Sequence, residues 1–304
     1  MSENLFKLFT TQFGTYLELK LQQMGSLLRG KTKEGFHVGK QAAPINQVAA
    51  ISAKQPAGRF APKQRTDADF TRRWVFPQDV EIDQLIDSFD ELRTIVDPKS
   101  QYSGNAAMAV GRAWDDSIIA AAFGVAQVGQ DAGGLSAEVF DTTQFQVSST
   151  FGSSAASGLS IAKLIEVIRI FRHFHVDLEN DARCLVIGSQ QESDLLNQVQ
   201  VVSTEYNNHP VLVDGRVKQF LGFQIVVTER LFTSSNVRQV IAFVHSGMYL
   251  GVWKDLTNRI SIRNDLSGEP YDLWTSSTFG ATRTQPGKVI QVLCADTSAG
   301  DITP

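Results

Sequence analysis

The strongest helical pattern in the chain lies at residues 103–123, SGNAAMAVGRAWDDSIIAAAF. Its apolar side chains recur every three or four residues and share one face: Ala107, Val110, Trp114, Ile118 and Ala121. This spacing predicts one long amphipathic helix whose apolar face packs against a core. Arg112 and Asp116 lie one turn apart on another face, so we expect them to form an i,i+4 ion pair.

After this helix, the sequence alternates between helical and strand patterns. Residues 124–158 are rich in Gly, Ser, Ala and Gln and predict a long loop or a strand pair. A second helix is predicted from about Ser160 to His175, with these side chains facing inward: Ile161, Leu164, Ile165, Ile168 and Phe171. Residues 184–187 predict a buried strand and 190–197 a short helix. The remaining strands are predicted at 217–227, 237–253, 259–263, 271–278 and 289–294, which makes the fold α+β.

Before the long helix, the patterns are weaker. Apolar residues at helical spacing predict an amphipathic helix at 5–28 and a short helix near residues 80–89. Between them, residues 36–73 are punctuated by Gly and Pro and predict an extended β-hairpin loop, with a turn near Gln55–Gly58. This loop has little core of its own, so a neighbouring chain is expected to cover it.

The overall composition is that of an ordinary globular protein, with 304 residues, 42% hydrophobic and 20% charged. No apolar run reaches the roughly 18 residues of a membrane span, and the first residues lack the apolar region of a secretory signal. Cys184 and Cys294 are too few for a disulfide framework or a thiolate metal cluster. We therefore expect folding in a reducing cytoplasm.

Charge is distributed unevenly along the chain. Residues 1–73 carry a net +7, whereas the rest of the chain carries −11. Such a basic segment reaches onto nucleic acid, onto an acidic neighbouring copy, or only into solvent. Aromatic residues are too sparse there for base stacking, which favours the neighbouring copy. The contact candidates are Arg59, Phe60, Lys63, Arg65, Arg72 and Arg73.

Catalytic and metal-binding patterns are weak. Ser160 and Lys163 fit the S-x-x-K motif of penicillin-binding proteins, but no Lys-Thr-Gly strand accompanies them, and Ser160 suits a helix cap better. His173 and His175 point to different faces of a helix, which is unsuitable for chelation. Asp115 and Asp116 likewise lie on adjacent faces and do not converge as an acid–base pair. No catalytic residue, metal site or cofactor is therefore predicted.

Three groups of stretches resemble the major capsid proteins of tailed bacteriophages with the Hong Kong 97 fold. The first comprises VEIDQLID (80–87), DPKSQY (97–102) and AVGRAWD (109–115). The second comprises VIGSQQESDLL (186–196), Asp214-Gly215 and LGFQIVVT (221–228). The third runs from HSGMYLG (245–251) through Asp265 to GATR (280–283). Together they span about residues 74–296, and the order of the parts is more specific than any single motif.

The resemblance implies a domain layout. Residues 1–35 would form an N-terminal arm, 36–73 the extended loop, and 74–154 a peripheral domain with the long spine helix. Residues 155–250 would form an axial domain, and 251–304 the return strands and tail. The scaffolding extension of some family members is missing, which implies a separate scaffolding protein.

It also implies a function: a shell subunit, not an enzyme, that assembles into the icosahedral capsid around a phage genome. Its partners would be copies of itself in pentamers and hexamers, a portal, and a cementing protein where one is present. Packaged double-stranded DNA would be touched without specificity, with no cofactor and no membrane. The protein would be found in the virion, after assembly in the host bacterial cytoplasm. The alternatives are an encapsulin-like compartment subunit and, in a different class, a soluble serine hydrolase using Ser160 and Lys163.

Overall fold

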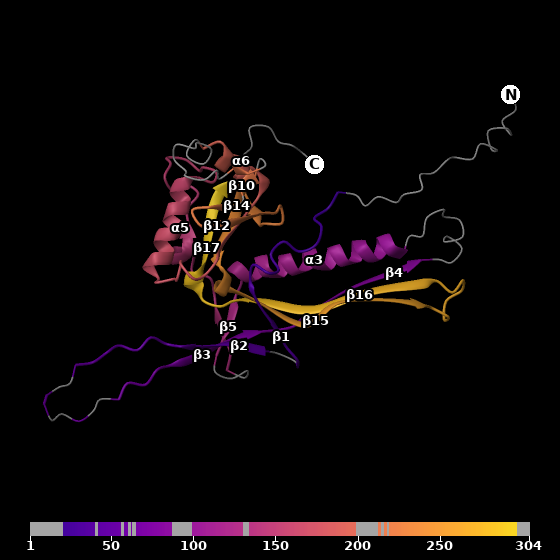
Figure 1. Cartoon of the computed structure of the whole chain (residues 1–304), viewed down its shortest axis with the longest axis horizontal. Coiled ribbons are helices and arrows are strands. Elements are labelled where there is room, and N and C mark those ends of the chain that lie inside the picture. Colours follow the sequence, from indigo (N-terminus) through magenta and orange to yellow (C-terminus); the bar gives the residue numbers. More distant parts are fainter. Residues whose placement is uncertain are drawn as a thin grey trace. The chain divides into compact units, whose positions relative to one another are not determined.

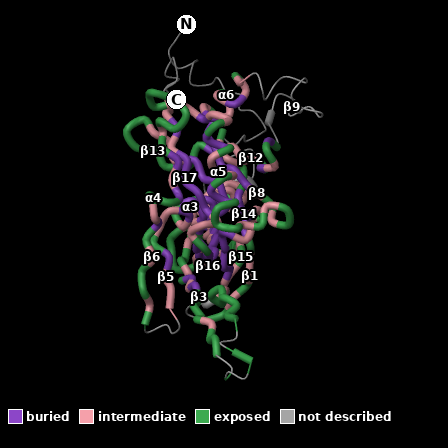
Figure 2. Tube along the Cα trace, turned by 90° about the vertical axis from the view of Figure 1, so that its left-hand side faces the viewer, coloured by how far each residue is buried: buried purple, intermediate pink, exposed green. Residues whose placement is uncertain are grey.

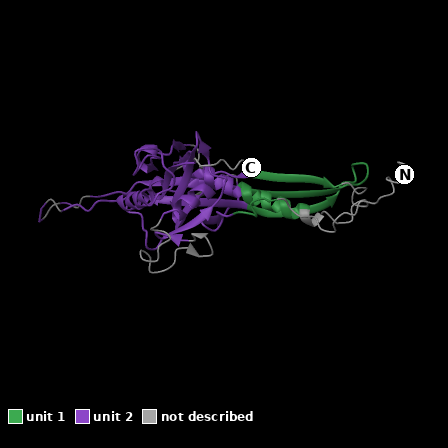
Figure 3. Ribbon diagram, turned by 90° about the horizontal axis from the view of Figure 1, so that it is seen from above, with its two compact units in different colours: residues 1–26, 79–113, 254–278 green, residues 27–78, 114–253, 279–304 purple. Residues whose placement is uncertain are grey.

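The computed structural model describes residues 21–39, 42–55, 58–59, 62, 65–86, 99–129, 134–198, 212–213, 216–217 and 219–296. The chain divides into two compact units, shown in Figure 3. Unit 1 consists of residues 1–26, 79–113 and 254–278, and unit 2 of residues 27–78, 114–253 and 279–304. The chain combines helices with several separate sheets, so the predicted α+β class is confirmed.

Helix α3, Lys99–Phe123, is the predicted long helix and begins four residues earlier than expected. Of the predicted apolar face, Val110, Trp114 and Ile118 are buried. In unit 2, the Trp114 ring meets Phe279 edge-on with ring centroids 6.2 Å apart. No helix among the described residues is both long and apolar enough to cross a membrane.

A four-stranded sheet has the order β1-β15-β16-β4. Its strands are β1 (Lys33–Phe36), β15 (Met248–Ile262), β16 (Tyr271–Arg283) and β4 (Gln78–Ile86). The short helix predicted near residues 80–89 was wrong over 80–86, because β4 occupies them, and 87–89 lie outside the described residues. The acidic residues Asp79, Glu81 and Asp83 alternate with less exposed neighbours, which is the two-residue period of a strand.

The largest sheet lies in unit 2 and has the order β11-β12-β8-β14-β17-β7, with β13 paired to β14. Its main strands are β12 (Phe223–Val227), β8 (Arg183–Ile187), β14 (Val237–Val244) and β17 (Val289–Ala295). The shorter ones are β11 (Gln219–Phe220), β13 (Thr233–Ser234) and β7 (Gln146–Val147). Figure 2 shows these central strands as the most deeply buried part of the chain.

Helices flank this sheet. Helix α5, Ile161–His173, contacts β17 and β7, and α6, Ser189–Leu196, follows β8. Both helices and the buried strand β8 were predicted at these places. Short elements complete the unit: α4 (Thr142–Phe145), η1 (His245–Gly247), η2 (Pro286–Lys288) and the pair β9 (Leu212–Val213) with β10 (Arg216–Val217).

A separate sheet of unit 2, in the order β2-β3-β5-β6, contains the predicted hairpin. Strands β2 (Ala42–Val48) and β3 (Phe70–Val75) pair antiparallel, with Val48 opposite Phe70. Strands β5 (Ala126–Val128) and β6 (Ser136–Glu138) extend the sheet and confirm the strand pair expected within 124–158. Of the predicted turn, residues 56 and 57 lie outside the described residues.

The helix predicted at 5–28 is absent where it can be compared. Residues 5–20 lie outside the described residues, and 21–28 contain no helix. Gly25 has a φ of +78°, a left-handed conformation that interrupts helical geometry. Within 21–28 the apolar residues do not form a helix: Leu28 is buried, whereas Leu21 and Met24 are exposed.

Candidate functional site

The β2–β3 hairpin, called the arm below, is anchored to unit 2 at its base. Arg73 is buried and its Nη1 lies 2.5 Å from Oε2 of Glu138 on β6. The indole Nε1 of Trp74 donates to the carbonyl of Gly129 at 3.1 Å, and the Gln47 amide donates to the carbonyl of Thr284 at 2.8 Å. These contacts fix the direction in which the arm leaves the unit.

A second buried guanidinium lies at the same base. Arg283 has no exposed surface and donates to the carbonyls of Ala122 at 2.9 Å and Gly124 at 3.0 Å. Burial lowers the pKa of Arg283 to about 10, and the nearby Arg73 acts in the same direction while Glu138 opposes it. The Glu138 carboxylate therefore pairs with Arg73 and also acts on Arg283 through its charge.

Beyond its base, the arm exposes apolar side chains. Val48, Ile51 and Phe70 keep 59%, 64% and 58% of their surface accessible. Figure 1 shows both strands continuing outward as extended segments, and residues 49–55 and 65–69 of these segments are exposed except for Ala68. A hairpin with so little core of its own is stabilised when another surface covers it.

The predicted contact residues fall into three groups. Arg59, Arg65 and Arg72 are exposed on the arm. Phe60 and Lys63 lie outside the described residues. Arg73 is a correction: its side chain points into unit 2 and is ion-paired there, so its charge is already used within the chain.

Unit 1 carries an acidic surface on the edge strand β4. Asp79 accepts a hydrogen bond from the Thr278 hydroxyl at 2.6 Å, and Glu81 accepts one from the Trp274 indole at 3.4 Å. The pKa of Asp83 is raised, chiefly by a hydrogen bond with Asp272. Desolvation and the negative charges of Asp272 and Glu81 raise this pKa further, whereas Arg263 lowers it.

The S-x-x-K pair has structural contacts. The Ser160 hydroxyl caps α5 by accepting from the backbone N–H of Lys163 at 3.4 Å. Lys163 is fully buried and donates to three carbonyls: Ser157 at 2.7 Å, Gly158 at 2.9 Å and Leu293 at 3.0 Å. Burial lowers the pKa of Lys163. Since all three N–H groups are engaged, this amine cannot serve Ser160 as a base without breaking those bonds.

No group of three or more His, Cys, Asp or Glu side chains suited to a metal ion occurs in the described part of the chain. His173 ends α5, while His175 follows the helix with a φ of +55°. The ring of His173 stacks edge-on against Phe174 with ring centroids 5.0 Å apart. A basic side chain at the C-terminal end of a helix, such as His173, interacts favourably with the helix dipole when it is protonated.

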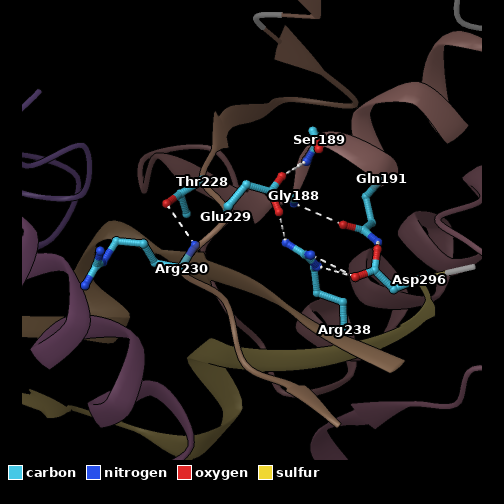
Figure 4. A network of polar contacts seen from close by, with 8 residues as sticks. All are labelled: Gly188, Ser189, Gln191, Thr228, Glu229, Arg230, Arg238 and Asp296. Atoms are coloured by element: carbon cyan, nitrogen blue, oxygen red, sulfur yellow. Dashed lines mark hydrogen bonds and ion pairs between the residues drawn. The ribbon is translucent and has the colours of Figure 1, made fainter. Parts of the chain in front are cut away.

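A polar network joins α6 to β12, β14 and the end of β17 (Figure 4). The Glu229 carboxylate accepts from the backbone N–H of Ser189 at 2.6 Å and pairs with Arg238. Arg238 also pairs with Asp296 at 2.8 Å, and Asp296 accepts from the Gln191 amide at 3.2 Å. These contacts join α6 to the ends of the central strands of the sheet.

The predicted Arg112–Asp116 pair was wrong, because each residue has another partner. In unit 1, Arg112 donates to the Gln22 side chain at 2.7 Å. In unit 2, Asp116 pairs with Arg230, whose side chain points away from the network in Figure 4. Partners distant in sequence cannot be read from i,i+4 spacing.

Asp115 has a role that sequence reasoning missed. It is fully buried, and its two oxygens accept the backbone N–H groups of Leu27 at 2.9 Å and Leu28 at 3.1 Å. It thereby ties residues 27–36, called the strap below, to α3. The Arg29 guanidinium reinforces this tie by lying 4.3 Å from the centre of the Trp114 ring. A carboxylate directly after Trp114, near the buried face of the helix, was the available signal.

Comparison with known proteins gives a consistent result. The model of the phage capsid protein family matches residues 6–296. A search of curated proteins finds no match. Among solved structures, a capsid chain of cyanophage P-SCSP1u is 13% identical, with a TM-score of 0.73 over 98% of this chain and 97% of that one.

Two further structures are similar to the same extent. A chain from Mycobacterium phage Che8 is 14% identical, with a TM-score of 0.71 over 94% of this chain and 97% of that one. A chain from the cyanophage Pam1 capsid is 11% identical, with a TM-score of 0.72 over 97% of this chain and 98% of that one. At these identities, the similarity concerns the fold.

Proposed function

This chain belongs to the phage capsid protein family, and from that premise we propose that its β2–β3 arm joins neighbouring subunits of the shell. As a major capsid protein with the Hong Kong 97-like fold, it forms the icosahedral shell of a tailed phage by self-assembly. The open question is therefore which surfaces carry the assembly. We propose rings of five and six copies, with residues 155–250 towards the centre and residues 74–154 at the periphery.

One observation carries the proposal for the arm: it is firmly anchored at its base yet exposes Val48, Ile51 and Phe70 beyond it. An anchored, apolar and basic projection is suited to covering an adjacent copy. Closed rings use head-to-tail contacts, in which two different patches meet. The arm would be one of them.

The acidic surface of β4 is suited to be the other patch. It presents three exposed acidic side chains, Asp79, Glu81 and Asp83. The arm presents Arg59, Arg65 and Arg72. Opposite charges on two surfaces of one chain favour contact between copies and fix its register.

Shortening the arm tests this proposal. Residues 50–68 would be replaced by a short Gly-rich turn, which retains the Ala49–Asp69 backbone hydrogen bond of 2.8 Å and the base. We expect a folded subunit, with unchanged melting behaviour, that forms few particles in negative-stain images. Normal particles from the shortened chain would reject the arm as an essential contact.

Membership of the family suggests further partners. We propose a separate scaffolding protein, a portal, a cementing protein where one is present, assembly in the host cytoplasm, and non-specific contact with packaged DNA. We further propose that the subunit is not an enzyme, because Lys163 is committed to three carbonyls. An encapsulin-like compartment shares this fold, and nucleic acid inside purified particles would distinguish a phage shell from it.

A further inference from the structure

The strap ends in β1, which lies at the edge of its sheet. This strand of four residues pairs in parallel with residues 249–252 of β15. The next residue, His37, continues the pairing by donating its backbone N–H to the carbonyl of Val252 at 2.9 Å. An edge strand this short opens at a low cost in free energy, so its side-chain contacts decide whether it stays in place.

One face of this strand pair contains a slot that holds the imidazole of His37. Gly35 and Gly251 lie opposite each other, and their missing side chains leave the space. A Cβ on Gly35 would lie 1.9 Å from the hydroxyl oxygen of Tyr249, and one on Gly251 would lie 3.1 Å from Cδ2 of His37. The imidazole and the phenol therefore occupy a gap that glycine at both positions leaves open.

Two aromatic side chains of β15 contact the imidazole in this slot. Its Nε2 lies 2.7 Å from the hydroxyl oxygen of Tyr249, and the Tyr249 and Trp253 rings lie 5.8 and 5.3 Å away between ring centres. A neutral imidazole accepts the phenol O–H at Nε2. The C-terminal end of the strap is thus held by a hydrogen bond and by ring packing, as its other end is held by Asp115.

The groups that contact this imidazole offer no negative charge to its protonated form. Burial raises the pKa of Tyr249, so the phenol stays neutral over the range in which histidine titrates, and Trp253 does not titrate. On the strap, Glu34 lies on the other face of β1 and pairs with Arg29 at 3.5 Å. Desolvation in the slot accordingly lowers the pKa of His37.

We propose that His37 is a proton-operated latch, which keeps the strap on β15 while the imidazole is neutral and releases residues 31–37 when the imidazole is protonated. The latch goes beyond the proposed function, because it operates within a single chain and does not depend on how copies meet. The neutral imidazole stabilises the strap fully above the ordinary histidine pKa of about 6.5, and this stability is lost as the pH falls through the lowered pKa. Lys33, two residues earlier on the same face of β1, opposes the protonated form further.

A second histidine contacts the strap and serves as the control. Nδ1 of His245, in η1, lies 3.1 Å from the carbonyl oxygen of Lys31. A carbonyl oxygen only accepts, so this nitrogen donates whether the imidazole is neutral or protonated, and protonation leaves the contact intact. The pH response of the strap should therefore depend on His37 and not on His245.

Hydrogen exchange in the unassembled subunit tests the latch. Mass spectrometry would compare exchange at about pH 7.5 and about pH 5, on either side of the ordinary histidine pKa, after correction for the intrinsic pH dependence of exchange. We expect protection of residues 33–37 to fall at least about threefold at the lower pH, while β14 and β17 stay protected. In His37→Gln, the amide retains a partner for the Tyr249 hydroxyl and does not titrate, so protection should be equal at both pH values. His245→Gln should respond like the wild type.

Three results would overturn the latch: equal protection of the wild-type strap at both pH values, a pH response that persists in His37→Gln, or one that disappears in His245→Gln. Loss of protection throughout unit 2 at the lower pH would overturn it as well, because the opening is assigned to one edge of a sheet. If His37→Gln leaves the strap unprotected at both pH values, His37→Phe decides, since its ring fills the slot and carries no proton. Protection in His37→Phe must then be independent of pH, and a remaining pH response would reject the role of His37.

Discussion

The Nζ atom of Lys163 lies 3.0 Å from the carbonyl oxygen of Leu293, a residue 130 positions further along the chain. The same ammonium group also binds the carbonyls of Ser157 and Gly158. A single buried cation thus joins α5, the loop before it and the last strand β17. The residue that fits a catalytic motif in the sequence is a structural cross-link in the fold.

Replacing Lys163 by Met should therefore destabilise unit 2. Methionine fills the space but leaves three carbonyls without their donor, so we expect the free energy of unfolding to fall by about 3 kcal/mol or more. Chemical denaturation of the unassembled subunit measures this. Ser160→Ala, which removes only the helix cap, should cost about 1 kcal/mol. Equal stability of the wild type and Lys163→Met would show that the three contacts do not stabilise the fold.

The strap should depend on Asp115 in the same way. In Asp115→Asn, an amide N–H₂ replaces one oxygen and faces a backbone N–H group of Leu27 or Leu28, so we expect a loss of about 1–3 kcal/mol. Limited proteolysis should then cleave within residues 27–36 sooner than in the wild type. Asp116→Asn is the matched control next to it, because the exposed pair with Arg230 is worth at most about 1 kcal/mol. Similar effects of the two variants would contradict the assigned role of Asp115.

The sequence predicted elements whose pattern is local and strong. Helices α3, α5 and α6 and the buried strand β8 were found because their apolar spacing continues over several turns or a whole strand. The helix predicted over 80–86 was wrong. Acidic and apolar residues alternate there with the two-residue period of a strand, which the apolar spacing taken alone does not reveal. At 21–28, Gly25 with its positive φ interrupts the helical spacing.

The candidate site was predicted less completely. The arm was found as a Gly- and Pro-punctuated hairpin with basic residues, but its anchor was not. Arg73 looks like its neighbours Arg72 and Arg65 in the sequence, and only its proximity to Glu138 on another strand distinguishes it. Asp115 and Lys163 were missed for the same reason: their partners are backbone groups brought near by the fold.

Glu138→Gln should loosen the base of the arm. The change removes the carboxylate that pairs with the buried Arg73, and leaving a buried charge unpaired costs about 3 kcal/mol. Since the Glu138 side chain is one-third exposed (33%), water offsets part of this loss. We expect a lower melting temperature and faster proteolysis within residues 42–75. Glu166→Gln, which loosens only an exposed Arg169 pair on α5, should change neither.

The acidic surface of unit 1 should respond to pH. Asp272 raises the pKa of Asp83 above its usual value, so the folded state holds that proton more tightly than the unfolded chain does. Stability from this group is therefore present at low pH and lost as the pH rises through the raised pKa. Asp83→Asn should remove this loss, as thermal melts between pH 3 and 7 can show. Asp265 is a control with the opposite sign, because Arg263 lowers its pKa to about 2 and its charged form is the one that stabilises the fold. Asp265→Asn should therefore destabilise unit 1 at neutral pH.

Charge exchange between the arm and β4 gives the sharpest test of how copies meet. Arg59→Glu with Arg65→Glu makes the arm acidic, and Glu81→Lys with Asp83→Lys makes the strand basic. Each pair of changes opposes like charges across the proposed contact, so particle yield should fall at least about tenfold. Combining all four restores opposite charges and should recover most of the yield. The effect should weaken in high salt, because charges at an exposed rim are screened within about 8 Å at physiological ionic strength. If the combined variant assembles no better than either pair alone, the arm of one copy does not meet β4 of the next, and another surface must receive it.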